Sequence, residues 1–476
     1  MRYNLLPHQQ RAVDKLSADD LRALLLYHGL GSGKTLTSIA AKDQLGLPAD
    51  VIVPASLREN YKKELLTHLG HIPKDMMIRS YNRAMKHPDE GPRGITIVDE
   101  GHNLGRPDSQ RSSLFQRLPE AEKLLIMTGS PIRNHPSELA PLINALHGKH
   151  VVSRQPTEFS RQFITKTKEY PGIVNVLRGV KPGVVENIKN RNRLLRLLAG
   201  RVDFRDNTDA AAEHFPAVTE RTIPVAMGDR QKLIYDAVMH KLPRSLRAKV
   251  RQLLPPTKQE LKQLNAFLTA ARQVSNNPAV YDTGATIEDA SKIQAAVKNM
   301  AARLGSEAGS KGVVYSNYLD ASLRPYKELL DRSGVPSAMI TGDVPFKARK
   351  QSVDDYNAGR LRALLLSAAG GEGLDLKGTS LVQLLEPHWN DERLKQAMGR
   401  AIRYKSHEGL PPDKRKVDVE RYLSVLPAKR TMFGGTKRPP SSVDEYLVDL
   451  SNRKTNLNAQ FLDVLREASG MGVREA

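Results

Sequence analysis

Residues 22–35, RALLLYHGLGSGKT, constrain the fold more than any other part of this 476-residue sequence. A short apolar run leads into a glycine-rich turn that ends in Lys34 and Thr35. Glycines let backbone N–H groups surround phosphates, while the lysine can reach the β- and γ-phosphates and the threonine can bind Mg²⁺. The strict pattern of such a loop has glycine where His28 stands. We therefore predict a strand, a triphosphate-binding loop and a helix, with the ligand held by Gly31, Ser32, Gly33, Lys34 and Thr35.

Two adjacent carboxylates follow a second apolar run. In TIVDEGH, residues 96–102, Asp99 can hold Mg²⁺ and Glu100 can orient or deprotonate an attacking water. A strand end followed by a solvated acidic turn is the alternative. Because a phosphate loop precedes the pair, we interpret Asp99 as a metal ligand and Glu100, together with Lys34, as catalytic residues.

The hydrophobic pattern is that of parallel sheets covered by helices. In the first part of the chain, the predicted strands are 22–27, 50–55, 94–100 and 123–129. After a long stretch of charged helical segments, the alternation returns, and the predicted strands are 311–317, 337–342, 362–368 and 380–386. The pattern predicts an α/β fold with two parallel-sheet lobes.

The domain limits follow from these changes in pattern. We expect an ATP-binding lobe at 1–150, a helical insertion or linker at 151–290, a second lobe at 291–430, and a C-terminal linker and helix at 431–476. Two capping boxes are also predicted, one formed by Ser56 with Glu59 and one by Ser442 with Glu445.

The charge balance favours a polyanionic partner. Lys and Arg number 73 against 52 Asp and Glu, a formal net charge of +21, and neutralising nucleic-acid phosphates releases counterions. A basic but merely soluble surface is the alternative. An anionic membrane would need a basic amphipathic helix or a lipid anchor, and the sequence offers neither.

Cysteine usage and hydropathy bear on the compartment. The absence of cysteine excludes disulfides, thiolate zinc sites and cysteine nucleophiles, and it suits the cytoplasm. No apolar run approaches the roughly 18 residues that span a bilayer, and the start has no signal-peptide core. We expect a soluble, cytoplasmic protein without a transmembrane segment.

A basic helix face is predicted in the second lobe. In QAMGRAIR, residues 396–403, Gln396, Arg400 and Arg403 are four and seven positions apart on a helix and share one face. Cations there could stabilise charge on a transferring γ-phosphoryl group, as arginine fingers do. An ordinary solvated basic face is the alternative.

The ordered set of motifs resembles superfamily 2 helicases and translocases, in the branch that contains the Swi/Snf-type motors. LLPHQQ resembles the adenine-reading glutamine motif, DEGH stands at the DEAH or DExx box, MTGSPIRNHPSEL is similar to the coupling motif, and GGEGLDL and QAMGRAIR look like the fifth and sixth motifs. The resemblance covers nearly the whole chain. It implies two RecA-like lobes that meet around ATP, with Mg²⁺ as cofactor, and nucleic-acid-stimulated hydrolysis.

The resemblance also assigns residues. It implies that Gln396, Arg400 and Arg403 face the γ-phosphate and that His102 links the two lobes. ATP contacts are implied for Gln9, Gly373 and Asp375. Contacts with nucleic acid, or coupling to it, are implied for Ser56, Ser80, Thr128, Ser130, Ser316 and Thr341. The single tryptophan, Trp389, is expected to pack in the core rather than stack on a base.

A closer kinship is carried by GRAIRYKSHEGLPPDKRKVDVERYL and SSVDEYL. They are similar to the poxvirus nucleoside triphosphatase I and its relatives in large DNA viruses. This implies DNA as the substrate, with RNA as the alternative, and an RNA polymerase or another transcription or replication protein as a partner. A monomeric motor and a place in the viral factory or the virion are implied too. One departure is Asn277, where the Swi/Snf family usually shows histidine.

Three functions fit these observations. The first is a DNA translocase that removes proteins or a polymerase from DNA without separating strands. The second is a strand-separating helicase for repair or recombination, which needs a wedge that the motifs do not reveal. The third is an ATP-gated scaffold that binds a polymerase, and intact catalytic motifs argue against it.

Overall fold

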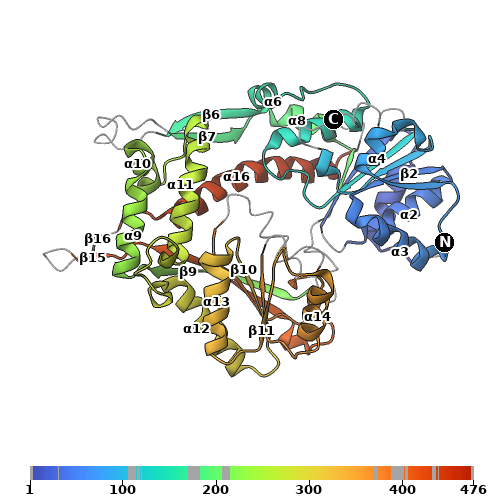
Figure 1. The fold of residues 1–476 in the computed structure, drawn as a ribbon. Helices are drawn as coiled ribbons and strands as arrows, with labels where there is room; N and C mark the ends of the chain where they lie inside the picture. Colours follow the sequence, from blue (N-terminus) through green and yellow to red (C-terminus); the bar gives the residue numbers. More distant parts are fainter. Residues whose placement is uncertain are drawn as a thin grey trace. The chain divides into compact units, whose positions relative to one another are not determined.

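The computed structural model describes residues 4–29, 32–104, 114, 118, 121–169, 183–205, 215–367, 374–387, 401–402, 406–430, 436–437 and 439–472 (Figure 1). The chain divides into two compact units. Unit 1 contains Met1–Lys166, Glu186–Ala211 and Lys454–Ala476, and unit 2 contains Thr167–Val185 and Ala212–Arg453. Each unit is built on a six-stranded parallel sheet.

The sheet of unit 1 has the strand order β3-β2-β4-β5-β1-β8. Its strands are β1 (Ala23–His28), β2 (Ala49–Val53), β3 (Met76–Ser80), β4 (Ile95–Val98), β5 (Lys123–Thr128) and β8 (Val202–Arg205). Side chains of β1 alternate between two cores, with Leu24 and Leu26 in one and Ala23 and Leu25 in the other. Because both faces are buried, this strand reads as an unbroken apolar run in the sequence.

Helices cover both faces of this sheet (Figure 1). One core is closed by α1 (Pro7–Ser17), α2 (Lys34–Leu45) and α3 (Arg58–Leu69). The other is closed by α4 (Tyr81–Lys86), α5 (Leu139–His147), α6 (Pro156–Phe163), α8 (Arg191–Leu198) and the C-terminal half of α16 (Val443–Ser469).

The sheet of unit 2 has the strand order β11-β12-β10-β13-β14-β9. Its strands are β9 (Ala217–Ala226), β10 (Gly312–Tyr315), β11 (Ser337–Ile340), β12 (Ala363–Leu366), β13 (Leu381–Leu384) and β14 (Lys416–Val425). On one face it packs against α12 (Ser291–Ser306) and α13 (Arg324–Arg332). On the other it packs against α14 (Phe346–Asn357).

A helical cluster extends unit 2. It is formed by α9 (Asp229–His240), α10 (Arg244–Gln252) and α11 (Lys258–Asn276) with the first turns of α16. Two small two-stranded sheets also occur, formed by β6 (Ile164–Glu169) with β7 (Gly183–Ile188) and by β15 (Lys429–Arg430) with β16 (Thr436–Lys437). Within the part of the chain that the structure describes, no helix is both long and apolar enough to cross a bilayer.

The predicted α/β fold with two parallel-sheet lobes is confirmed, and each predicted strand is present. Sequence reasoning missed the strands of both small sheets and four strands of the large sheets that carry charge or stay exposed, namely β3, β8, β9 and β14. Residues 151–290, where helices alone were expected, contain β6, β7, β8 and β9. Of these, β8 and β9 contribute one edge strand to each large sheet, and β8 has only four residues while β9 is mostly exposed. An edge strand with exposed, charged positions carries little hydrophobic signal.

One capping prediction is confirmed and one is wrong. The Ser442 and Glu445 side chains exchange hydrogen bonds with each other's backbone N–H groups at 2.7 Å and 3.2 Å. At the other site, a 3₁₀ turn takes up Ala55–Leu57, and α3 begins only at Arg58 without a side-chain cap. Ser56 therefore lies in the turn rather than at the helix start.

Candidate active site

The phosphate loop joins the carboxyl end of β1 to α2. Gly33 precedes α2 with φ of 76°, a left-handed conformation that glycine adopts without strain. A Cβ atom at this position would lie 2.2 Å from Nε2 of Gln9. Both the backbone conformation and the close approach of Gln9 therefore require glycine here. The Ser32 hydroxyl donates to the carbonyl oxygen of Gly29 at 2.8 Å, which closes the turn, and Gly31 lies outside the described residues.

The Lys34 ammonium lies inside this loop. Its Nζ atom donates to the carbonyl oxygens of His28 and Gly29, both at 2.9 Å. Burial lowers the pKa of this ammonium, while the nearby Glu100 and Asp99 carboxylates oppose the shift. Lys34 is thus held between the loop carbonyls and the two carboxylates. Thr35 follows in the first turn of α2 and is half-buried.

The sheet order brings the carboxylates to the same edge as the loop. β5 lies between β4 and β1, so residues that follow all three strands share one sheet edge. Asp99 follows β4, and burial raises its pKa to about 6, with a further contribution from Glu100 and opposition from Lys34. A carboxyl group in this position is poised to lose its proton when a cation arrives.

Glu100 adopts an unusual backbone conformation. Its φ is 52°, a left-handed value that is rare for a residue other than glycine. The Glu100 N–H donates to Oδ1 of Asp99 at 2.9 Å, and the Tyr81 hydroxyl donates to the Asp99 carbonyl oxygen. Such strain persists only where the surroundings enforce it, and it is common at functional sites.

A chain of close contacts runs from Glu100 through His102 to the next motif. Nδ1 of His102 lies 3.2 Å from Oε2 of Glu100 and 2.8 Å from Oγ1 of Thr128, and the Ser130 N–H donates to the same Oγ1 at 3.1 Å. Burial, with Arg133 and Lys34, lowers the pKa of His102 to about 3, so the ring is neutral. The chain connects the catalytic candidate to Thr128 and Ser130. These partners of His102 all lie in unit 1.

Gln9 is directed at the loop. Its Nε2 donates to the carbonyl oxygens of Ser32 and Gly33 at 3.3 Å and 3.4 Å, and its Oε1 accepts the Leu6 N–H at 2.8 Å. Both ends of the amide are therefore engaged by protein. In this arrangement Gln9 supports the phosphate loop, and its expected role as the adenine reader stays a prediction.

The expected nucleic-acid residues differ in exposure. Ser56 is exposed, and Ser80 accepts the Arg83 N–H at the start of α4. Thr341 is buried, and the Ser316 hydroxyl is fully buried against the Glu386 carboxylate. The arrangement therefore leaves the hydroxyls of Ser316 and Thr341 away from the protein surface.

Several expected residues fall outside the described part of the chain. These are Gly373, Gln396, Arg400, Arg403 and Trp389, along with Gly31. Asp375 is described, and it is an exposed residue of unit 2 whose carbonyl oxygen accepts a hydrogen bond from Asn357 at 3.0 Å.

Sequence reasoning missed three residues whose hydrogen bonds support the phosphate loop. His8, Arg11 and Asp203 contact it directly or through His28, and they come from α1 and β8. The one available signal was His28 itself, since a histidine at a glycine position needs a partner for its ring.

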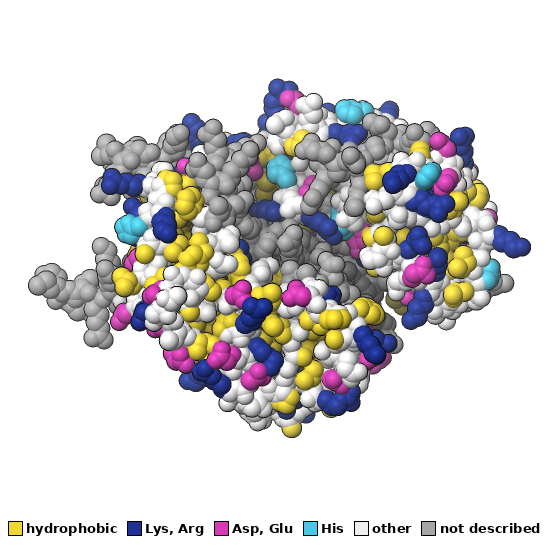
Figure 2. Space-filling model, in the orientation of Figure 1, with side chains coloured by type: hydrophobic (Ala, Val, Ile, Leu, Met, Phe, Trp, Pro, Cys, Tyr) yellow, Lys and Arg dark blue, Asp and Glu magenta, His cyan; other side chains and the backbone are white. Residues whose placement is uncertain are grey.

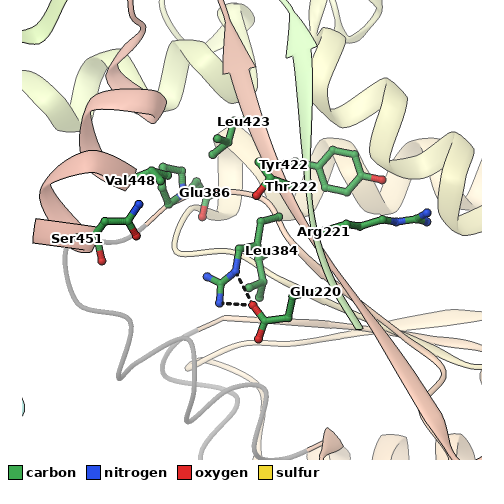
Figure 3. Close-up of a pocket in the computed structure, with 12 residues that line it drawn as sticks. Glu220, Arg221, Thr222, Leu384, Glu386, Tyr422, Leu423, Val448 and Ser451 are labelled. Atoms are coloured by element: carbon green, nitrogen blue, oxygen red, sulfur yellow. Dashed lines mark hydrogen bonds and ion pairs between the residues drawn. The ribbon is translucent and has the colours of Figure 1, made fainter. Parts of the chain in front are cut away.

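Unit 2 contains a separate cavity of about 320 Å³, lined by residues of β9, β13, β14 and α16 (Figure 3). Arg421 donates to Glu220 at 3.0 Å and 3.1 Å across it, and Arg221 pairs with Glu420 nearby. Because both arginines already bind carboxylates, this cavity is poorly suited to a phosphate.

The fold and the site define the class of protein. Unit 1 combines a strand, a phosphate loop and a helix with an Asp-Glu pair that follows another strand of the same parallel sheet, which is the arrangement of a P-loop ATPase. Comparison with known families gives the branch. Residues 74–280 match the SNF2-related domain and residues 291–405 match the helicase conserved C-terminal domain. The chain belongs to the SNF2-like helicases of superfamily 2, which are ATP-hydrolysing enzymes.

Viral proteins are among its relatives. A protein of Acanthamoeba polyphaga mimivirus, provisionally named an ATP-dependent RNA helicase, is 26% identical over 97% of this chain and 96% of its own length. The termination factor NPH-I homologue of African swine fever virus is 22% identical over 95% of this chain and 76% of its own length. The expected kinship with the viral nucleoside triphosphatase family is thereby confirmed.

A repair protein and a solved structure are also similar. The DNA repair protein rhp54 of Schizosaccharomyces pombe is 22% identical over 79% of this chain and half of its own length. The SWI2/SNF2 ATPase core of Sulfolobus solfataricus, solved with double-stranded DNA, has 18% identity, a TM-score of 0.38, and 89% coverage of both chains.

Proposed function

We propose that this protein is a DNA-stimulated ATPase that couples ATP hydrolysis to movement along nucleic acid. The observation that carries the proposal is the position of Lys34 beside Asp99 and Glu100, with Glu100 connected through His102 to Thr128. A phosphate-binding cation and two carboxylates meet there, and the carboxylates are connected to a neighbouring strand end. Hydrolysis can therefore be coupled to a second event.

Each residue has a proposed task in hydrolysis. Lys34 leaves its loop carbonyls and binds the β- and γ-phosphates of ATP, while Glu100 orients and deprotonates the water. Thr35 and Asp99 would hold Mg²⁺, and they fit it because hydroxyl and carboxylate oxygens are the ligands it prefers. When bound with ATP, Mg²⁺ neutralises charge on the phosphates. Gln9, Gly31, Ser32 and Gly33 complete the proposed loop.

The second unit has proposed residues too. Gln396, Arg400 and Arg403 match the family positions that face the γ-phosphate, and Gly373 and Asp375 match the fifth motif. We assign the arginines the stabilisation of charge on the transferring γ-phosphoryl group.

Nucleic acid is the proposed partner because the chain carries a formal net charge of +21. On the face drawn in Figure 2, lysine and arginine side chains lie scattered among acidic ones rather than in a single patch. Because contacts with phosphates carry no sequence information, we expect little base specificity.

In unit 2, the loop after β11 offers a surface for this contact. Phe346, which begins α14, is 82% exposed, and Lys347 and Lys350 beside it are exposed as well. Arg349 donates to the carbonyl oxygens of Gly342 and Val344 at 2.6 Å and fixes the loop. An exposed aromatic ring flanked by cations suits a nucleic-acid strand. We therefore assign the contact to this loop and helix start, next to Thr341.

The finer identity of the partner is also a proposal. One viral relative is named a termination factor and another an RNA helicase. We favour DNA as the track and transcription as the setting, with an RNA polymerase as the protein partner. A strand-separating repair helicase is the second candidate, because a relative is named a DNA repair protein.

The test is ATP turnover with single-stranded DNA, duplex DNA and RNA at one fixed salt concentration, since affinities depend steeply on salt. Stimulation that is greatest with DNA supports the proposal, and a turnover rate that is the same with and without nucleic acid contradicts it. A duplex-unwinding assay beside a triplex-displacement assay then separates the two candidates, because a translocase displaces the third strand without opening the duplex.

A further inference from the structure

His28 stands at the end of β1, where the strict phosphate-loop pattern has glycine. Its imidazole is fully buried, and its Nε2 donates to Oδ1 of Asp203 at 2.6 Å. Asp203 is also fully buried and belongs to β8, the strand that pairs with β1. The side chain that replaces glycine is therefore tied to an aspartate 175 positions later in the sequence.

Asp203 holds a second element as well. Nε of Arg11 donates to its Oδ2 at 2.8 Å, and Nη2 of Arg11 donates to its Oδ1 at 3.0 Å. Arg11 lies on α1, one helical turn from His8, whose Nε2 donates to the carbonyl oxygen of Ser32 at 2.9 Å. The same turn carries Gln9, which also bonds the loop. One carboxylate thus joins β1, β8 and α1 beneath the loop.

The protonation states follow from these contacts. Burial alone would raise the pKa of the Asp203 carboxyl, but hydrogen bonds from His28 and Arg11 hold it below its usual range. Burial lowers the pKa of His28 despite the pull of Asp203. A neutral ring that donates from Nε2 to an ionised aspartate has its proton on that nitrogen. The pair is a charge-assisted hydrogen bond, stronger than one between neutral groups.

Asp203 can influence Lys34 through the backbone of the loop. The carbonyl oxygens that hold its ammonium belong to His28 and Gly29. We propose that Asp203 is a positioning residue of the ATP site, which orients the loop for Lys34 through His28 and holds α1 against the loop through Arg11. The role rests on the proposed function, because it concerns the same ATP hydrolysis. Ligand-binding groups need such support to stay within a fraction of an ångström of their productive place.

A matched pair elsewhere in the sheet separates positioning from plain stability. Asp50 of β2 accepts two hydrogen bonds from Arg79 of β3, with Nε to Oδ1 at 2.8 Å, and both side chains are buried. Neither residue contacts the phosphate loop through these bonds. Asp50→Asn and Asp203→Asn therefore each replace a carboxylate that is buried in the same sheet and accepts two hydrogen bonds from an arginine.

The experiment measures kcat and KM for ATP at saturating DNA, together with melting temperature with and without ADP. We expect both variants to lower the melting temperature of the nucleotide-free protein. Only Asp203→Asn should lower kcat/KM for ATP, by about tenfold or more, and lose most of the stabilisation by ADP. His28→Gly, which restores the strict pattern, should act like Asp203→Asn, and His28→Gln should recover part of the loss because its amide can still donate to Asp203.

The outcomes are distinct. Equal kcat/KM and equal ADP stabilisation in Asp203→Asn and Asp50→Asn would overturn the positioning role, as would wild-type kinetics in His28→Gly. If the wild-type protein binds ADP but does not hydrolyse ATP, the proposed function is wrong. The ADP-dependent shift in melting temperature still tests the role of Asp203 in that case. A wild-type protein that neither binds nor hydrolyses nucleotide would overturn both.

Discussion

The Nδ1 atom of His102 lies 3.2 Å from Oε2 of Glu100 and bridges this carboxylate to the Thr128 hydroxyl at the end of the adjacent strand. Because the proposed base Glu100 contacts His102, a change in the motif around Thr128 can alter the rate of ATP hydrolysis. We expect Thr128→Val to reduce DNA-stimulated turnover at least about tenfold and unstimulated turnover much less, because valine keeps the shape but leaves His102 and the Ser130 N–H without this partner. The measurement is ATP turnover with and without saturating DNA.

A buried threonine on the preceding strand provides the control for this prediction. Thr96 of β4 is buried, and Thr96→Val should leave the ratio of stimulated to unstimulated turnover close to that of the wild type. If Thr128→Val lowers both rates equally, the contacts of His102 support the site but do not couple it to DNA binding.

Substitutions of the two candidate catalytic residues, Lys34 and Glu100, should have different effects on ATP binding. Lys34→Ala removes the phosphate-binding charge, so we expect loss of ATP binding and of turnover by more than about a hundredfold. Glu100→Gln keeps the size of the side chain but cannot accept the water proton, so turnover should fall as far while ATP binding persists. Binding is measured by titration with a fluorescent ATP analogue. Turnover that survives in both variants would refute the assignment.

The raised pKa of Asp99 predicts a pH dependence. Below about pH 6 the carboxyl group is protonated and cannot bind Mg²⁺, so kcat/KM for ATP should fall on the acid side with an apparent pKa near that value. Because Mg²⁺ favours the carboxylate, a higher Mg²⁺ concentration should move this limb to lower pH. The pH dependence of kcat/KM measured at two Mg²⁺ concentrations tests this prediction. If the acid limb does not move with Mg²⁺, a group other than Asp99 is responsible for it.

The same shift predicts a stability effect of opposite sign. The folded protein binds the Asp99 proton more tightly than the unfolded chain does, so stability is lost as the pH rises from about 4 to about 6. Asp99→Asn should therefore raise the free energy of unfolding by about 1–3 kcal/mol at pH 7.5 in the absence of Mg²⁺ and nucleotide, and by almost nothing below pH 4. Urea denaturation at both pH values measures this, and the variant should lose turnover.

The sequence predicted those parts of the fold and site whose physics is local. A buried parallel strand is a run of apolar residues, and a phosphate loop is a run of glycines before Lys34, so both can be read within a dozen positions. Asp203 could not be found in this way. It sits in a four-residue strand with two charged side chains, and its partners His28 and Arg11 are far away in the sequence.

Exposure was the other property that the sequence could not supply. Ser316 occupies a motif position, but its hydroxyl is satisfied by Glu386, which is 70 residues further on. Phe346, in contrast, belongs to no predicted set and is almost fully exposed. Both facts depend on how β10, β11 and β13 align in the sheet, and hydrophobic pattern alone does not specify that alignment.

A fully buried ion pair in unit 2 leads to a prediction about the free energy of unfolding. Lys292 of α12 donates to Asp444 of α16 at 2.7 Å, and neither side chain is exposed. Lys292→Met should lower the free energy of unfolding by about 3–5 kcal/mol, because it leaves a buried carboxylate without its cation. The exposed pair Lys327 and Asp331 on α13 is the control, and Lys327→Met should cost less than about 1 kcal/mol. Equal costs for the two substitutions would show that Asp444 finds compensation elsewhere.

The surface around Phe346 predicts how the protein holds DNA. Lys347 and Lys350 are exposed beside it, and removing one phosphate-binding cation should reduce the slope of log affinity against log salt by about one. We expect Lys347→Ala with Lys350→Ala to weaken DNA binding to all sequences alike and to flatten that slope. Phe346→Ala should leave the slope unchanged but weaken single-stranded DNA more than duplex, since only unpaired bases can stack on the ring. Anisotropy titrations at several salt concentrations measure both effects. An unchanged affinity in all of these variants would move the DNA-binding surface away from this helix, because neither cation nor ring would then touch the strand.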